Sequence, residues 1–545
     1  MELGKYTWVT KVVFLFFLLP LLGFSQDTLR YKLWESEVKD NNQRIQLYTK
    51  VIDAKPDEWA FYYRGWAYLG QNKLSLAQQD FQLILGAANS RILPAAPMAG
   101  MAQRYFQDGD YKMAIRWADK SLESSLNNAI AYRIRGKSKA RIGDLLGAAT
   151  DLDFALALEP MNAENYGERA SVAWLSDDSK LAVINIEKAI ALNPKDEKYQ
   201  VRKVWIKIMS GTTENLESLI NSLYNIKTDD PELNYQLGQI FFANEKYIIS
   251  ENYFNAALGF YENQIRNDNG YAQRKVEEIY PVYLERGLCR QYQEKFRDAL
   301  NDFSRASQLK PEDPLTYLHM GELHTFQENY VDAIQAYEKA FRINPRLSDG
   351  WLNLGYSYFQ IGKPQEAIVA YERGIMADST DCMLYNNKGY TLLELKEFSK
   401  GIQEINKSIQ LCPDAMMPRV SKGEYYFMAE AYDEAISQIT LAFQMPDSNS
   451  AALAAGYYTR GKSYLQKKEL KKAIDDFNNS LKIEPQRISA IEQLGIAYYR
   501  LEEFCKAYHY FKFALGLDVR NEIKQAPVSA YYIGMIQGIV IGGCP

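Results

Sequence analysis

The chain has 545 residues, 47% of them hydrophobic, and its 63 basic and 68 acidic side chains give a formal net charge of −5. The basic residues form no block and are not interleaved with stacking aromatic residues, so we expect no nucleic-acid partner. A chain of this length would ordinarily form roughly three or four domains, but an array of small repeats can be one unit because its contacts join only neighbouring repeats.

The first 25 residues differ in kind from the rest. Lys5 and Lys11 precede an apolar run at residues 12–22, and Gly23 and Ser25 supply small residues before Gln26. This is the pattern of a secretory signal peptide. The run is too short for a comfortable membrane span, so we expect no stable span after cleavage, with an uncleaved anchor as the alternative. The sequence therefore predicts a periplasmic or extracellular protein of the secretory pathway.

Between Pro314 and Ala415, one 34-residue pattern is written three times. Counted from the first residue of each repeat, it places a small residue at position 8, an aromatic residue at 11, a small residue at 20, an aromatic residue at 24 and a proline at 32. The residues that show it include Gly321, Gly355, Gly389, Ala333, Ala367, Gly401, Tyr358, Tyr337, Tyr371, Pro345 and Pro413. This unit resembles the tetratricopeptide repeat, a pair of antiparallel helices that buries its apolar faces by stacking on the next pair.

The resemblance implies an all-α fold, a right-handed superhelical α-solenoid of about 13 helix-turn-helix repeats with capping helices at both ends. We divide the chain into a signal peptide (1–25), an amino-terminal cap or partial repeat (26–57), repeats 1–4 (58–196), a degenerate repeat 5 (197–230), repeat 6 (231–264), an insertion (265–279), repeats 7–13 (280–521) and a carboxyl-terminal capping helix (522–545). The insertion contains the turn signal Asn269-Gly270, and we interpret it as a lengthened helix pair rather than a separate binding arm.

Candidate catalytic or metal-binding residues are few. His319 and Glu322 lie three residues apart on one predicted helix, but they are not part of an HExxH motif, and the sequence has no phosphate-binding glycine loop or nucleophile elbow. We therefore predict no enzyme activity, no metal site and no cofactor.

The chain has five cysteines and no CxxC motif. Cys382 and Cys412 fall at positions 1 and 31 of one repeat, which an antiparallel helix pair brings to the same end. Two interpretations remain for this pair, a disulfide in an oxidising compartment or two separate buried thiols.

In the family, the first helix of each repeat lines the concave side, and positions 6 and 9 face the groove there. From the sixth repeat onward every residue at position 6 is polar. These residues are Gln236, Glu285, His319, Asn353, Asn387, Ser421, Thr459 and Gln493. Tyr356 and Tyr390 stand at position 9. Asn353 and Asn387 resemble the asparagine ladder with which the repeat domain of O-GlcNAc transferases holds a peptide backbone. Asparagine is also a common consensus residue at this position. For the two tyrosines, the alternative is that they pack between neighbouring helices.

The function that the resemblance implies is binding rather than catalysis. We expect a protein-protein interaction scaffold that holds a peptide or protein segment in the concave groove, since aromatic rings beside amides suit apolar anchoring and backbone hydrogen bonds. Two alternatives remain: a solenoid that binds a glycan or envelope polymer, and an accessory subunit of a secretion or envelope-assembly complex. The oligomeric state is not predicted.

Overall fold

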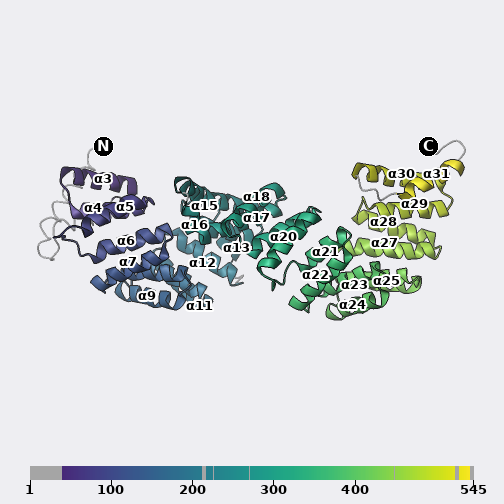
Figure 1. Ribbon diagram of the computed structural model, residues 1–545, viewed down its shortest axis with the longest axis horizontal. Coiled ribbons are helices and arrows are strands. Elements are labelled where there is room, and N and C mark those ends of the chain that lie inside the picture. Colours follow the sequence, from purple (N-terminus) through teal and green to yellow (C-terminus); the bar gives the residue numbers. More distant parts are fainter. Residues whose placement is uncertain are drawn as a thin grey trace. The chain divides into compact units, whose positions relative to one another are not determined.

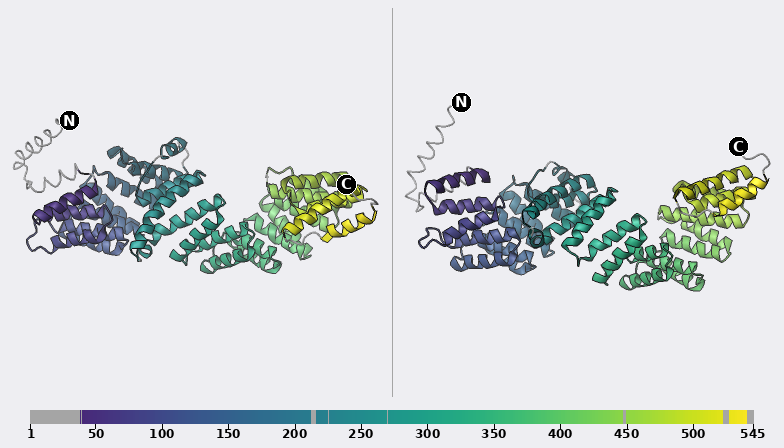
Figure 2. Two further views of the ribbon diagram at one scale, coloured as in Figure 1. Left: turned by 90° about the horizontal axis from the view of Figure 1, so that it is seen from above. Right: turned by 45° about the horizontal axis from the view of Figure 1, so that its top comes forward.

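The computed structural model describes residues 38 and 40–539, apart from 212–215, 225, 269, 447–448 and 522–526. These residues form 29 α-helices and no strand, which confirms the all-α repeat fold (Figure 1). The predicted signal peptide lies outside the described residues. The contacts divide the chain into two compact units between Pro311 and Glu312, and each unit is a stack of antiparallel helix pairs (Figure 2).

Unit 1 ends at Pro311 and its first described helix, α3, packs against the first complete pair. Its helices are α3 (Asn41–Ala54), α4 (Glu58–Leu69), α5 (Leu74–Leu85), α6 (Ala95–Asp108), α7 (Tyr111–Ser124), α8 (Ala129–Arg141), α9 (Leu145–Leu158), α10 (Ala163–Leu175), α11 (Ser179–Leu192), α12 (Glu197–Met209), α13 (Leu216–Asn221), α14 (Pro231–Ala243), α15 (Tyr247–Asn267), α16 (Tyr271–Arg274), α17 (Val276–Tyr292) and α18 (Phe296–Leu309).

Unit 2 begins at Glu312 and its last helix, α31, packs against α30. Its helices are α19 (Pro314–Phe326), α20 (Tyr330–Ile343), α21 (Trp351–Gln360), α22 (Pro364–Ala377), α23 (Cys382–Glu394), α24 (Phe398–Leu411), α25 (Met416–Met428), α26 (Tyr432–Ala442), α27 (Ser450–Gln466), α28 (Leu470–Ile483), α29 (Ile488–Arg500), α30 (Phe504–Asn521) and α31 (Pro527–Ile539).

One residue with a positive φ recurs at position 15, in the turn between the two helices of each pair. The residues are Asn72, Gly109, Gly143, Asp177, Gly211, Glu245, Glu294, Glu328, Gly362, Lys396, Glu430, Lys468 and Glu502. This left-handed conformation ends the first helix and reverses the chain. Because most of these residues are not glycine, the turn is set by the helices that it joins rather than by the preference of the residue itself.

The spacing of these turns locates the irregular repeats. Glu245 and Glu294 are 49 residues apart, whereas the regular spacing is 34. The extra residues lengthen α15 to 21 residues and α17 to 17 residues, and they add the short helix α16 between them. In the fifth repeat, the second helix α13 has only 6 residues, and Val204 and Leu223 are buried at positions that hold small residues elsewhere.

The glycine at position 8 of the first helix lies against the large side chain at position 24 of the second. A Cβ atom added at Gly238 would lie 2.3 Å from Phe254 Cε1, and one at Gly355 would lie 2.3 Å from Tyr371 Cε1. At position 20, Ala333 and Ala367 are fully buried. The two helices of a pair can approach this closely only because these positions carry no bulky side chain.

A second recurrent contact is a buried ion pair between positions 7 and 23, which the sequence analysis missed. The pairs are Arg64–Asp80, Arg135–Asp151, Arg286–Asp302 and Arg460–Asp476. Each guanidinium donates two hydrogen bonds to its aspartate, and Arg460 does so over 2.8 Å for both. A comparison of the repeats in the sequence indicates this pairing, because the residues at positions 7 and 23 can change together. The repeat that has Leu354 at position 7 instead of arginine has Ala370 at position 23 instead of aspartate.

This pair predicts a specific result for Asp476→Ala. The change leaves the mostly buried Arg460 without its carboxylate, so we expect a loss of about 3–5 kcal/mol in the free energy of unfolding. The double variant Arg460→Leu, Asp476→Ala copies the residues found at Leu354 and Ala370 and should recover most of that loss. Chemical unfolding of both variants tests this, and a double variant as unstable as the single one would contradict it.

Candidate functional site

Within each unit, the first helices of successive repeats contact one another, whereas a second helix contacts mainly the first helices beside it. The face formed by the first helices is therefore the more tightly curved one. In unit 2 this face is formed by α19, α21, α23, α25, α27 and α29, and we call it the inner face. All of the sequence-predicted groove residues except Gln236 and Glu285 belong to these helices.

The two asparagines of the predicted ladder are engaged by the core of the protein. The side chain of Asn353 lies close enough to the hydroxyl of Tyr337 in the preceding repeat to influence its pKa, and Asn387 is placed in the same way beside Tyr371. Burial raises the pKa of both tyrosines, and these amides oppose the rise. Asn387 Oδ1 also accepts a hydrogen bond of 3.0 Å from Asn386. Asn353 and Asn387 thus lie beside buried hydroxyl groups, which competes with a role in holding a ligand backbone.

Other position-6 residues are also withdrawn from the surface. Ser421 is 4% exposed and Thr459 is 1% exposed, so both lie in the interior and neither presents its hydroxyl to a partner. Gln236 is buried in unit 1, where it lines a cavity. His319 and Gln493 are half-buried, and His319 Nδ1 lies 2.9 Å from Glu322 Oε2. The polar column is therefore largely a packing feature.

The aromatic residues of the inner face are more accessible. Tyr356 is 39% exposed and its ring packs edge-on against Tyr330. Phe359 and Tyr390, from neighbouring first helices, meet with ring centroids 5.9 Å apart. Burial raises the pKa of Tyr390, and Glu424 and Glu394 raise it further. Tyr356 and Tyr390 thus remain candidates for ligand contact.

The same face continues across α25 and α27 through a charged pair that the sequence analysis missed. Lys462 Nζ lies 3.4 Å from Glu424 Oε1. It also lies 4.4 Å from the ring centroid of Phe427 and 4.7 Å from that of Tyr458. We call Phe359, Tyr390, Glu424, Phe427, Tyr458 and Lys462 the inner row. It runs over four successive first helices and combines half-buried rings with one anion and one cation.

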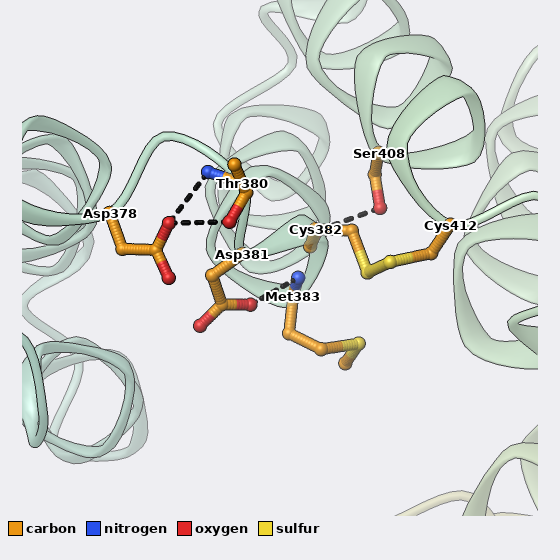
Figure 3. Close-up of a disulfide and its surroundings, with 7 residues drawn as sticks. All are labelled: Asp378, Thr380, Asp381, Cys382, Met383, Ser408 and Cys412. Atoms are coloured by element: carbon orange, nitrogen blue, oxygen red, sulfur yellow. Dashed lines mark hydrogen bonds between the residues drawn. A yellow bond between two sulfur atoms is a disulfide. The ribbon is translucent and has the colours of Figure 1, made fainter.

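Cys382 and Cys412 form a disulfide (Figure 3). Of the two interpretations of this pair, the structure therefore has the disulfide and not the two separate thiols. The bond joins the start of α23 to the residue after α24, with the Cα atoms 6.0 Å apart. Ser408 Oγ donates a hydrogen bond of 2.7 Å to the Cys382 carbonyl beside it. The disulfide therefore fixes the two ends of this repeat to each other.

Unit 1 differs because its insertion closes the face formed by its own first helices. Arg274 forms an ion pair of 3.0 Å with Asp108, and the Tyr111 hydroxyl donates a hydrogen bond to Glu278. These contacts join the turn between α6 and α7 to α16 and α17. They enclose a cavity of about 740 Å³ lined by residues of both regions. The insertion is thus a contact element within unit 1.

Ion pairs lie at the wall of this cavity. Arg141 pairs with Glu232 at 3.3 Å, and Lys137 pairs with Glu168 at 3.1 Å. Burial alone would raise the pKa of Glu168, but Lys137 and Arg202 outweigh it and bring that pKa to about 2. The carboxylate of Glu168 is therefore charged at neutral pH, and the wall consists largely of paired charges rather than free ones.

Glu285, which lies behind Tyr235 and Gln239 of this wall, forms no ion pair with a cation among the described residues. Its Oε1 accepts hydrogen bonds of 2.5 Å from Tyr235 and 2.8 Å from Gln239. Gln239 in turn accepts a hydrogen bond of 2.6 Å from Trp205 Nε1. Burial raises the pKa of Glu285 to about 7, although the hydrogen bonds from Tyr235 and Gln239 oppose the shift.

Two kinds of feature are absent from the part of the chain that the structure describes. No helix in this part is long and apolar enough to cross a bilayer. Nor does this part contain a cluster of three or more histidine, cysteine, aspartate or glutamate side chains arranged to hold a metal ion.

Comparison with known proteins identifies repeats in the region that carries the inner row. Residues 284–348, 320–381, 384–415 and 454–487 match family models described as tetratricopeptide repeat. The human DnaJ homolog subfamily C member 3 is 26% identical over 185 residues, which are 32% of this chain and 37% of that protein. The tetratricopeptide repeat protein 36 homolog of Nematostella vectensis is 34% identical over 71 residues, 13% of this chain and 39% of that protein. The chain thus matches well under half the length of either relative.

Two solved structures are similar at low sequence identity. A tetratricopeptide repeat protein from Parabacteroides merdae is 16% identical, with a TM-score of 0.42 over 49% of this chain and 98% of that chain. A chain of the APC/C hetero-tetramer Cut9-Hcn1 is 15% identical, with a TM-score of 0.41 over 93% of this chain and 96% of that chain.

The environment of Glu285 predicts a pH-dependent stability. Its pKa in the folded protein is about 7 against an ordinary value of 4.5, so the folded state holds a proton there that the unfolded state releases. The contribution is complete below about pH 4.5 and is lost as the pH rises through about 7. It amounts to at most about 3 kcal/mol. Glu285→Gln keeps the acceptor for Tyr235 and Gln239 but cannot titrate.

Urea unfolding of the protein and of Glu285→Gln between about pH 5 and pH 8 measures this effect. We expect the variant to gain stability relative to the unchanged protein as the pH rises. A stability difference that does not change with pH would show that Glu285 is ionised throughout this range.

Proposed function

We propose that the protein is a non-catalytic scaffold that binds a segment of a partner protein on the inner face of unit 2. The proposal starts from the match of residues 284–381, 384–415 and 454–487 to tetratricopeptide repeats. The observation that carries the proposal is the inner row, which crosses four neighbouring repeats through contacts between successive first helices. Each member of the row is half-buried, so part of its surface remains open to a ligand.

The dimensions of the row suit an extended segment. Packed helices lie about 8–10 Å apart, so three intervals between first helices cover about 24–30 Å. An extended chain advances about 3.3 Å per residue, and about 8 or 9 residues would therefore span the row. Apolar side chains of the segment would pack on Phe359, Tyr390 and Phe427, and its charged groups would pair with Glu424 and Lys462.

We further propose that the protein works outside the cytoplasm. Residues 1–25 have the composition of a signal peptide, and the Cys382–Cys412 bond is of the kind that oxidising compartments sustain. A periplasmic or extracellular partner follows from this location. The same aromatic row would also suit a glycan, because sugar rings stack on tyrosine, so the glycan alternative is included in the test.

The test starts from a peptide library and a polysaccharide array probed with the full chain. For the ligand that binds best, we expect Tyr390→Ala and Phe427→Ala each to weaken binding by about ten-fold or more, as anchors in a partly desolvated row do. Phe513→Ala, which removes an exposed ring from the second helix α30, is the matched control and should leave the affinity unchanged.

Asn353→Ala combined with Asn387→Ala distinguishes packing from recognition. These changes should lower the unfolding midpoint, since each leaves a buried tyrosine hydroxyl with one polar neighbour fewer.

If inner-row variants bind as the unchanged protein does, while Phe513→Ala loses affinity, binding does not occur on the inner face. A ligand found only on the polysaccharide array would replace the protein partner by a glycan.

A further inference from the structure

A groove of about 1230 Å³ opens in unit 2 between α20, α21 and α22. It is formed by the second helices of two successive repeats together with the first helix between them, and no member of the inner row lines it. Its apolar lining includes Trp351, Leu354, Val369 and Met376. It is therefore a surface separate from the site proposed above.

The groove exists because α21 begins late. In the neighbouring repeats, Asp313 and Asp381 cap the first helix by accepting hydrogen bonds from the backbone of Leu315 and Met383. The corresponding position holds Leu347, which has no side-chain acceptor. Helix α21 starts three residues into the repeat, after Gly350 in a left-handed conformation, and has 10 residues instead of the 13 of α19 and α23.

The floor of the groove is held in place by its own contacts. The rings of Phe341 and Trp351 stack with centroids 3.5 Å apart. Trp351 Nε1 donates a hydrogen bond of 2.9 Å to the Leu347 carbonyl. On the walls, Val369 is 49% exposed and Met376 is 78% exposed. Phe341 and Trp351 are themselves buried, so a partner meets mainly the exposed Val369 and Met376 above a rigid support, and ordering of that support adds little to the cost of binding.

The charges around this floor are predominantly basic. Exposed guanidinium groups of Arg342, Arg346 and Arg373 line the groove, and none of them has a carboxylate partner among the described side chains of unit 2. Two glutamates, Glu338 and Glu366, also line the groove, and Glu338 accepts a hydrogen bond from Tyr358 without losing its charge. Three arginines against two glutamates leave the lining with a formal charge of +1.

We propose that this groove binds an acidic amphipathic helix of a partner protein. Helices α20 and α22 have 14 residues each, about 21 Å at 1.5 Å per residue, so a partner helix of about four turns matches their length. Its apolar side chains at i, i+3, i+4 and i+7 pack on the exposed Val369 and Met376, and its carboxylates pair with the three arginines. A helix fits better than a strand because the groove offers side chains and no unpaired sheet edge.

Fluorescence anisotropy with the full chain tests this proposal with three labelled peptides of about 14 residues. One carries leucine at helical spacing among glutamates, one has the same composition in scrambled order, and one has lysine in place of glutamate. We expect the first to bind at least ten-fold more tightly than the other two. Its affinity should fall as the salt concentration rises, because exposed charge pairs are screened.

The triple variant Arg342→Glu, Arg346→Glu, Arg373→Glu should weaken binding of that peptide at least ten-fold, and Met376→Glu should weaken it as well. Both leave the fold intact because these side chains are exposed. The matched control makes the same change of charge at exposed lysines elsewhere on second helices, with Lys400→Glu, Lys472→Glu and Lys506→Glu. It should bind like the unchanged protein, and so should Tyr390→Ala.

Four results would overturn the proposal. Equal binding of the scrambled peptide, or equal losses in the two triple variants, would reduce the effect to general charge attraction. Loss of binding in Tyr390→Ala would move the peptide to the inner face. Self-association of the full chain that the three arginine substitutions abolish would assign the groove to a second copy of this chain.

Discussion

The contact between a glycine at position 8 and a large side chain at position 24, most often an aromatic ring, sets the geometry of most helix pairs. At Gly321 an added Cβ would lie 2.6 Å from the ring of Tyr337, and at Gly461 it would lie 2.7 Å from the ring of Phe477. The ring therefore occupies the space that a side chain on the first helix would need. A pair that is fixed in this way presents its remaining surfaces to the next pair at a repeated angle, and the stack is built mainly from contacts between neighbouring helices.

Hydrogen bonds and ion pairs between buried polar groups add to this arrangement. Ser121, Ser408 and Ser480 at position 27 each donate a hydrogen bond to the carbonyl of the first residue in their repeat. The Arg–Asp pairs join positions 7 and 23 inside the pair, and Asn353 and Asn387 reach back to tyrosines of the preceding repeat. The surfaces that these contacts leave over can vary from repeat to repeat. The inner row and the groove beside α21 both arise from such variation.

The sequence was sufficient for the helix pairs, because Gly321, Ala333 and Tyr337 recur with a fixed period and have a direct packing meaning. It was a poor guide to the site. The family pattern predicts that a polar residue at position 6 faces a ligand, but Ser421 and Thr459 are buried and Asn353 lies beside the hydroxyl of Tyr337 in the core. Spacing along one helix shows which face a residue shares, whereas the depth of that face depends on the neighbouring repeats. The same limit concealed the pairing of Lys462 with Glu424, which are 38 residues apart, and the missing cap at Leu347.

The most direct test of the central role of the glycine contact is native-state hydrogen exchange in α14 and α15 for two variants of one repeat. Gly238 lies against Phe254, whereas a Cβ at Gly259 in α15 would meet nothing within 4 Å. We predict that Gly238→Ala lowers the free energy of opening of this pair by about 1–3 kcal/mol through overpacking. Gly259→Ala should raise it by about 0.5–1 kcal/mol, because alanine is the better helix former at an exposed site. Equal shifts of the same sign in both variants would show that the contact between glycine and ring does not determine how the pair packs.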